Sequence, residues 1–156
     1  MPVERVLFIC MGNICRSPLA EGLFLHKIAL RNVSGRFEVD SAGTGGWHAG
    51  ERADRRMRTV AGSHGITLPS RARQVEAADF AHFHALVCMD EDNRAALLAA
   101  GAPSDKISLL LEHDSTTKER NVPDPYYGGT DGFEHVYDLV DSACDALLAG
   151  LLPPTR

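Results

Sequence analysis

The chain has 156 residues, 44% hydrophobic and 24% charged, a balance typical of a globular protein with its own core. Its formal net charge of -5 argues against general nucleic-acid binding, since proteins that read a phosphate backbone usually carry a basic excess. No stretch of the sequence approaches the roughly 20 apolar residues that span a membrane, so we expect no membrane partner.

The predicted elements alternate between strands and helices. Short apolar runs, of which Val6-Leu7-Phe8-Ile9 is the first, predict strands at residues 6–9, 37–42, 85–89 and 107–111. Apolar residues at helical spacing predict helices from about 17 to 30, over 52–63, from 90 to about 101, and over 130–148. A loop over 112–129 carries Pro123-Asp124-Pro125. No repeats or linkers interrupt the pattern, so we expect a single domain spanning residues 1–156.

Alternating strands and helices predict right-handed βαβ units and a mostly parallel sheet, an α/β fold. With four strands in the order 2-1-3-4, the order reverses beside the first strand. Doubly wound sheets bind ligands outside the carboxyl ends of the strands at such a point. The loop that follows the first strand is therefore the expected site.

That loop reads Cys-Met-Gly-Asn-Ile-Cys-Arg-Ser over residues 10–17. A loop of this length can turn its backbone N–H groups around a tetrahedral oxyanion, and the following helix adds the positive end of its dipole. Arg16 supplies a planar fork of donors for phosphoryl oxygens. Such surroundings lower a thiol pKa from ~8.5 to a value in the range ~3.5–7.5. Cys10 is therefore the candidate nucleophile and Arg16 the candidate phosphate ligand.

The residues between and after them suit a phosphate-binding loop. Gly12 and Asn13 tolerate positive φ, and Ser17 can donate a hydrogen bond to the Cys10 thiolate. The amide of Asn13 could brace the loop against Ser41 on the second strand. The whole predicted loop comprises Met11, Gly12, Asn13, Ile14, Cys15 and Ser17. A tight turn with one buried cysteine is the alternative, but the strand before and the helix after favour catalysis.

The segment from Val6 to Glu21 resembles the signature of the low-molecular-weight protein tyrosine phosphatases. Further landmarks of that family recur in the same order: Asp40-Ser41-Ala42-Gly43-Thr44 with Trp47-His48, Met89-Asp90 with Asn93, and Asp124-Pro125-Tyr126-Tyr127. The resemblance covers nearly the whole chain. It implies a flavodoxin-like three-layer sandwich and a phosphatase that uses no metal or other cofactor. The chain departs from better-known relatives near Ser70, where some carry a histidine that supports the loop network.

Asp124 is the candidate general acid, because a phosphomonoester leaving group needs a proton as its P–O bond breaks. Prolines on both sides hold its backbone extended. A surface aspartate in a proline turn is the alternative, and the resemblance assigns Asp124 the proton-donor role. The expected reaction proceeds through a phosphocysteine on Cys10, which water hydrolyses with Asp124 as base.

Trp47, Tyr126 and Tyr127 are candidate walls of a cleft that accepts a phenyl ring and excludes the shorter phosphoserine. Ordinary packing is the alternative for all three. Cys15 is close enough in sequence to Cys10 to form a reversible disulfide that shields the nucleophile, and the resemblance favours this role over a small inward-pointing loop residue. The remaining cysteines, Cys88 and Cys144, are predicted to be core residues.

The resulting prediction is a protein tyrosine phosphatase acting on phosphotyrosine proteins and aryl phosphates, with inorganic phosphate as product and competitive inhibitor. We expect a cytoplasmic protein, because the sequence contains no signal-peptide pattern, and a monomer as the default oligomeric state. The alternative enzyme is a thiol-dependent arsenate reductase of the same fold, but no cysteine lies between Met89 and Ala143 to relay electrons. A non-enzymatic phosphate-binding module is the third possibility, and it would not need Cys10.

Overall fold

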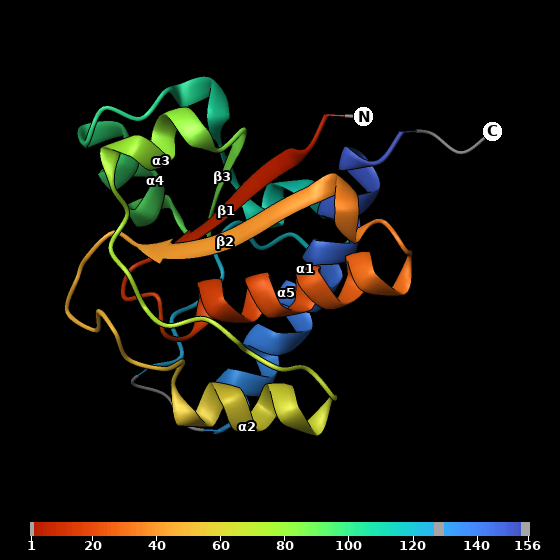
Figure 1. The fold of residues 1–156 in the computed structure, drawn as a ribbon. Helices are drawn as coiled ribbons and strands as arrows, with labels where there is room; N and C mark the ends of the chain where they lie inside the picture. The colour runs from red at the N-terminus through yellow and green to blue at the C-terminus, as the bar shows by residue number, and fades with distance from the viewer. Residues whose placement is uncertain (1, 127–129, 154–156) are drawn as a thin grey trace.

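A four-stranded parallel sheet forms the centre of the computed structural model, which describes residues 2–126 and 130–153. Its strands are β1 (Glu4–Cys10), β2 (Phe37–Gly43), β3 (Ala85–Cys88) and β4 (Ile107–Leu109). They lie in the order β2-β1-β3-β4, which confirms the predicted topology (Figure 1). The order reverses beside β1, since β1 pairs with both β2 and β3.

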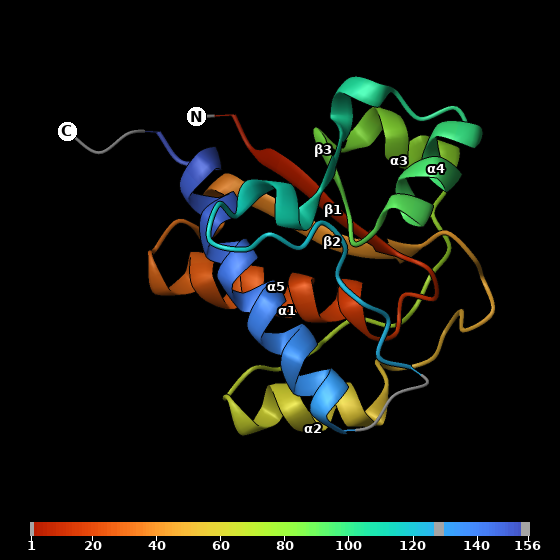
Figure 2. The same ribbon diagram turned by 180° about the vertical axis from the view of Figure 1, so that it is seen from behind.

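Helices cover both faces of the sheet. The helices are α1 (Arg16–Leu30), α2 (Arg55–Ser63), α3 (Ala77–His82), α4 (Glu91–Ala99) and α5 (Thr130–Leu151). α1 and α5 lie on one face, with α2 packed against the first half of α5, and α3 and α4 lie on the other (Figures 1 and 2). The predicted flavodoxin-like three-layer arrangement is confirmed. No helix in the described ranges is long and apolar enough to cross a membrane.

Alternation along β1 fills both cores. Phe8 packs toward α1, where its ring centre lies 5.7 Å from that of Phe24, while Leu7 and Ile9 belong to the cluster beneath α3 and α4. A strand buried on both faces is a continuous apolar run, which is why the sequence pattern is so clear. The packing also fixes the position of Cys10, the last residue of the strand.

Several predicted boundaries differ from the structure, and one helix was missed. The helix predicted over 52–63 begins at Arg55, because the Asp54 carboxylate caps it by accepting the Arg56 N–H at 2.8 Å. The strand predicted over 107–111 ends at Leu109, where a 3₁₀ turn over 110–113 begins. The strand predicted over 85–89 ends at Cys88. α3 has only six residues, too few for an apolar repeat to reveal it.

Candidate active site

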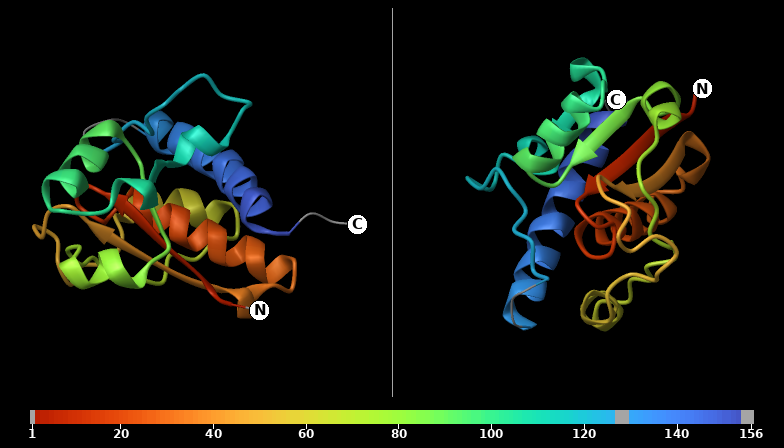
Figure 3. Two further views of the ribbon diagram at one scale, coloured as in Figure 1. Left: turned by 90° about the horizontal axis from the view of Figure 1, so that it is seen from above. Right: turned by 90° about the vertical axis from the view of Figure 1, so that its left-hand side faces the viewer.

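A cleft of about 360 Å³ opens at the carboxyl edge of the sheet. The right-hand view of Figure 3 looks onto this edge, where the loops after β1 and β2 meet. The lining residues are Cys10, Met11, Gly12, Ile14, Cys15, Arg16, Trp47, His48, Asp124 and Tyr126. Candidates from three separate parts of the sequence are therefore brought into one cavity.

The loop over residues 11–15 curls between the end of β1 and the start of α1. Asn13 adopts φ 57°, the left-handed conformation expected for an inward-turning loop. The backbone after β2 lies against this loop, since the Thr44 N–H donates to the Cys10 carbonyl at 2.9 Å. Gly43 permits the approach, because a Cβ there would lie 2.8 Å from the Met11 carbonyl oxygen.

The sulfur of Cys10 is nearly buried and has two hydrogen-bond partners. Ser17 Oγ lies 3.0 Å from Sγ, and the Asn13 N–H donates to Sγ at 3.3 Å. The N-terminus of α1 begins six residues after Cys10 and adds unpaired N–H groups to the same edge. Donors arranged in this way stabilise negative charge that develops on the sulfur.

The side chain of Asn13 links the loop to β2 and to the segment before α3. Its Nδ2 donates to Ser17 Oγ at 2.8 Å and to Ser41 Oγ at 3.0 Å, the latter being the bracing contact expected from the sequence. Its Oδ1 accepts the Arg73 N–H at 3.0 Å. Because Ser17 Oγ accepts a hydrogen bond from the Asn13 amide, its own O–H is free to point at the Cys10 sulfur.

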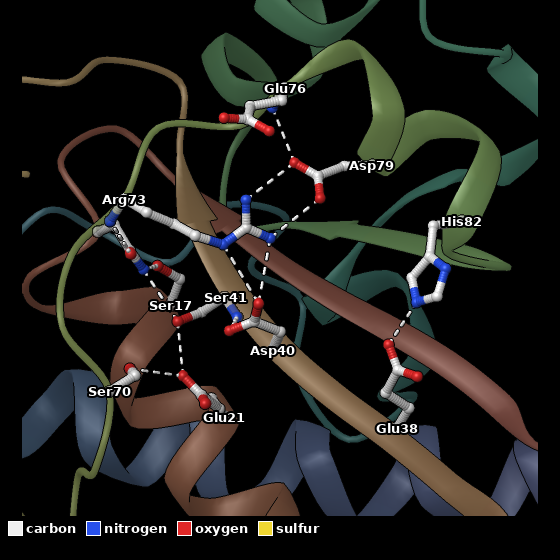
Figure 4. Close-up of polar contacts among 11 residues, drawn as sticks. Ser17, Glu21, Glu38, Asp40, Ser41, Ser70, Arg73, Glu76, Asp79 and His82 are labelled. Carbon is white, nitrogen blue, oxygen red and sulfur yellow. Dashed lines mark hydrogen bonds and ion pairs between the residues drawn. The ribbon is translucent and has the colours of Figure 1, made fainter.

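Glu21 lies at the other end of this chain of contacts (Figure 4). The carboxylate is 5% exposed and accepts hydrogen bonds from Ser41 Oγ at 2.6 Å and from Ser70 Oγ at 2.7 Å. Burial raises the pKa of Glu21 above its ordinary value, although both hydroxyl donors act to lower it. Ser70, where the sequence departs from the family pattern, therefore contributes a hydroxyl donor to the network.

Arg73 extends the network to α3 (Figure 4). Its guanidinium donates two hydrogen bonds to Asp79, each at 3.0 Å, and one to Asp40 at 3.2 Å. Asp79 also accepts the Glu76 N–H at 2.7 Å and so caps α3. Arg73 therefore ties α3, β2 and the loop of Asn13 together.

Arg16 is buried and faces two carboxylates and a carbonyl. Its Nη1 donates to Asp90 Oδ2 at 2.6 Å and to the Val122 carbonyl at 3.0 Å, and its Nη2 lies 3.6 Å from Asp124 Oδ2. Burial alone would lower the pKa of Arg16, but the charges of Cys10 and Asp90 and the hydrogen bond to Asp90 raise it. The guanidinium is therefore charged and held beside the cleft.

Asp124 and the aromatic residues surround the cleft mouth. Asp124 Oδ1 accepts the Tyr126 N–H at 3.0 Å, and the aspartate side chain is 32% exposed. Trp47 is 71% exposed, and its ring covers Gly45, where a Cβ would lie 1.8 Å from the ring. Tyr126 is half-buried and lines the cleft. Tyr127, the third predicted aromatic wall, lies outside the described residues.

The cysteines divide into two groups. Cys15 lines the cleft beside Cys10. Burial raises the pKa of Cys15, and the charges of Asp54 and Cys10 raise it further, so its thiol stays protonated at neutral pH. Cys88 and Cys144 are fully buried in β3 and α5, and burial raises the pKa of Cys88 to about 12.

The sequence identified some of the remaining site residues without giving them a role. His48 lines the cleft, and Asp90, which is the N-cap of α4, holds Arg16. Both stand in segments that resemble family landmarks, and this resemblance could have marked them as site residues. Arg73 and Glu21 were missed because their contacts are long-range. Within the described residues, no group of three or more His, Cys, Asp or Glu side chains is arranged to hold a metal ion.

The fold and the cleft together define a doubly wound α/β protein that presents a thiol, a guanidinium and a carboxylate at the carboxyl edge of its sheet. Residues 5–153 match the family described as low molecular weight phosphotyrosine protein phosphatase. The chain therefore belongs to the low molecular weight phosphotyrosine protein phosphatase family and is an enzyme of the protein-tyrosine-phosphatase class.

Individual relatives agree with this assignment. A low molecular weight protein-tyrosine-phosphatase of Streptomyces coelicolor is 42% identical over 153 residues, covering 94% of this chain and 93% of its own. The low molecular weight phosphotyrosine protein phosphatase of Homo sapiens is 40% identical over 149 residues, with coverage of 93% and 94%. A crystal structure of a protein tyrosine phosphatase from Entamoeba histolytica superposes with a TM-score of 0.91 at 40% identity, covering 95% of this chain and 96% of that one.

Proposed function

We propose that this enzyme hydrolyses phosphotyrosine in proteins through a phosphocysteine intermediate, with Cys10 as nucleophile, Arg16 as phosphate ligand and Asp124 as general acid and base. The observation that carries the proposal is the presence of all three side chains in one cleft of about 360 Å³. The fold brings these side chains together, since Cys10 ends β1, Arg16 opens α1 and Asp124 follows β4.

In the first step the Cys10 thiolate attacks phosphorus in line with the bond to the leaving group. The loop N–H groups and the Arg16 guanidinium hold the equatorial oxygens, whose charge they stabilise as the transition state forms. Asp124, at the mouth of the cleft, gives its proton to the departing phenolate oxygen. An S–P bond forms, an O–P bond breaks, and tyrosine leaves in its neutral form.

In the second step water attacks the phosphocysteine. Asp124, now ionised, accepts a proton from that water, and the Cys10 thiolate leaves as inorganic phosphate forms. The Ser17 hydroxyl, 3.0 Å from Sγ, supports this step by donating to the sulfur as its charge returns. Inorganic phosphate fits the same loop and is expected to compete with substrate.

The rim supports an aryl substrate. Trp47 and Tyr126 both line the cleft, so a phenyl ring bound there would contact aromatic side chains on its way to Cys10. A phosphoserine side chain is shorter and would leave its phosphate above the loop. The substrate class proposed is therefore phosphotyrosine in proteins.

The arsenate reductase alternative lacks a supporting observation. Such a reductase passes electrons from the nucleophile through further thiols, and Cys88 and Cys144 are both fully buried in regular secondary structure. Cys15 is the other thiol at the cleft.

The test compares the wild type with Cys10→Ser on p-nitrophenyl phosphate and on a phosphotyrosine peptide, in the presence of a chelator. We expect hydrolysis by the wild type, with competitive inhibition by inorganic phosphate, and no detectable hydrolysis by Cys10→Ser. Full activity in that variant would overturn the proposal. Thiol-dependent reduction of arsenate faster than phosphate-ester hydrolysis would support the reductase instead.

A further inference from the structure

A second pocket adjoins the cleft next to Tyr126. The Arg56 guanidinium lies 5.4 Å from the ring centre of Tyr126, which lines the cleft, and 4.6 Å from that of Phe133. The second pocket measures about 320 Å³, and its lining residues are Arg55, Arg56, Thr59, Val60 and Phe133. The pair formed by Arg56 and Tyr126 therefore separates the two pockets.

The α2 side of the second pocket is basic, although the whole chain carries a net charge of -5. Five arginines stand on the loop before α2, on α2 itself and on the segment paired with that loop: Arg52, Arg55, Arg56, Arg58 and Arg71. The carboxylates in the same segments are Glu51 and Asp54. These segments therefore carry a net positive charge, while α5, on the other side of the pocket, contributes the carboxylates of Asp131 and Glu134.

Arg55 is the cation available to a ligand there. Asp54 is already engaged, because it accepts hydrogen bonds from Nε and Nη2 of Arg56 at 3.2 and 3.0 Å. Arg55 is exposed and forms no ion pair with any carboxylate of the described residues. Glu134 on α5 faces His64 at 3.5 Å, at the other end of α2.

We propose that this second pocket binds an acidic side chain of the phosphoprotein substrate, close in sequence to the phosphotyrosine. The proposal rests on the proposed function and adds a preference among phosphotyrosine sites. A glutamate carboxylate would pair with the Arg55 guanidinium, a geometry that arginine favours. The methylenes of that glutamate would contact Val60 and Phe133 on the apolar part of the pocket.

The experiment measures kcat/KM for matched phosphotyrosine peptides that differ only in the flanking residue: glutamate, glutamine, or a second phosphotyrosine. Each value is divided by the same enzyme's kcat/KM for p-nitrophenyl phosphate, which has no flanking residue. At low salt we expect the wild type to prefer the glutamate peptide over the glutamine peptide by about two- to fivefold, the size of one partly exposed ion pair. Concentrated salt should remove most of that preference.

Arg55→Gln should abolish the preference, and Arg55→Glu should reverse it. Arg36→Gln is the matched control, since Arg36 is exposed, unpaired in the described residues and located before β2, far from the carboxyl edge; it should keep the wild-type preference. Equal values for the glutamate and glutamine peptides, or a preference that survives Arg55→Glu, would overturn the inference. A stronger preference for the second phosphotyrosine alone would also overturn it, because the anion bound would be a phosphate. Absence of p-nitrophenyl phosphate hydrolysis would instead contradict the proposed function.

Discussion

The hydroxyl oxygen of Ser17, in the first turn of the helix that follows the loop, lies 3.0 Å from the sulfur of Cys10. Ser17 Oγ also accepts a hydrogen bond from the Asn13 amide at 2.8 Å. Since a hydroxyl has a single proton, this arrangement leaves the Ser17 O–H directed at the sulfur. The reactivity proposed for Cys10 therefore depends on the side chain of Asn13 as well as on Ser17.

Ser17→Ala tests this dependence. Removing one hydrogen bond to a charged group costs about 1.5–3 kcal/mol, which corresponds to a loss in kcat of roughly ten- to 150-fold. The loss should fall mainly on the second step, in which the thiolate leaves, so a burst of phenol release should become visible in rapid-mixing experiments. Ser104→Ala, in an exposed 3₁₀ turn, is the control. Retention of more than half of the wild-type kcat by Ser17→Ala would contradict the assignment.

Asp124→Asn isolates the proton-transfer role. The amide keeps an oxygen that can accept the Tyr126 N–H but has no acidic proton to give, so we expect kcat to fall about 10²- to 10⁴-fold. The loss should be larger for phenyl phosphate than for p-nitrophenyl phosphate, because p-nitrophenolate leaves more readily without a proton. Asp92→Asn, an exposed carboxylate on α4, serves as the control. Equal losses on both esters would show that Asp124 acts in some other way.

The fold was predictable because its determinants are local. The apolar run in β1 and the helical spacing in α5 each appear within one window of sequence, and the alternation of strands and helices limits the topologies. The missed helix α3 also has a local explanation. α3 has six residues, and its start is set by a backbone cap between Glu76 and Asp79 rather than by an apolar pattern.

Spacing alone indicated the candidate site only where its residues share a loop, whereas Asp124, Trp47 and Tyr126 were identified from their motifs and the family resemblance. Cys10, Arg16 and Ser17 stand within eight positions, so their spacing alone indicated a phosphate-binding loop. The contact between Ser70 and Glu21 joins residues 49 positions apart, and that between Arg73 and Asn13 joins residues 60 apart. No local spacing encodes such pairs, which depend on how the segment before α3 crosses the sheet edge.

Cys15→Ser tests the redox role of the second thiol. Peroxide oxidises the Cys10 thiolate to a sulfenic acid, and attack by the Cys15 sulfur then forms the disulfide and releases water. Wild-type enzyme treated with hydrogen peroxide should therefore regain most of its activity in dithiothreitol, while Cys15→Ser should regain little. Because burial raises the pKa of Cys15, protection of the wild type should improve as the pH of the peroxide treatment rises.

The control for this experiment is Cys144→Ala, which removes a buried thiol of α5. Its recovery should match that of the wild type. If Cys15→Ser recovers as fully as the wild type, Cys15 has no protective role. A mass-spectrometric search for a Cys10–Cys15 disulfide in the oxidised wild type provides an independent readout.

Glu21→Gln tests the cost of a buried carboxylate behind the loop. Burial raises the folded-state pKa of Glu21 above the value of 4.5 that applies to an unperturbed glutamate. Between these two pKa values the folded chain binds more protons than the unfolded chain, so the free energy of unfolding falls as pH rises. The destabilisation that comes from burying the ionised Glu21 carboxylate is absent below pH 4.5 and complete above the folded-state pKa.

Glutamine removes that titration while keeping an oxygen that can accept hydrogen bonds from Ser41 and Ser70. The amide protons of the glutamine lower the free energy of unfolding by an amount that does not vary with pH. The test is therefore how the difference in free energy of unfolding between variant and wild type changes with pH, and not its size at one pH. Urea unfolding from pH 4.5 to 7.5 should show Glu21→Gln gaining stability relative to the wild type as pH rises. Asp105→Asn, an exposed carboxylate without an ion pair in the described residues, should show no comparable trend. Parallel curves for Glu21→Gln and the wild type would mean that Glu21 titrates alike in the folded and unfolded chains, and its burial would then carry no pH-dependent cost.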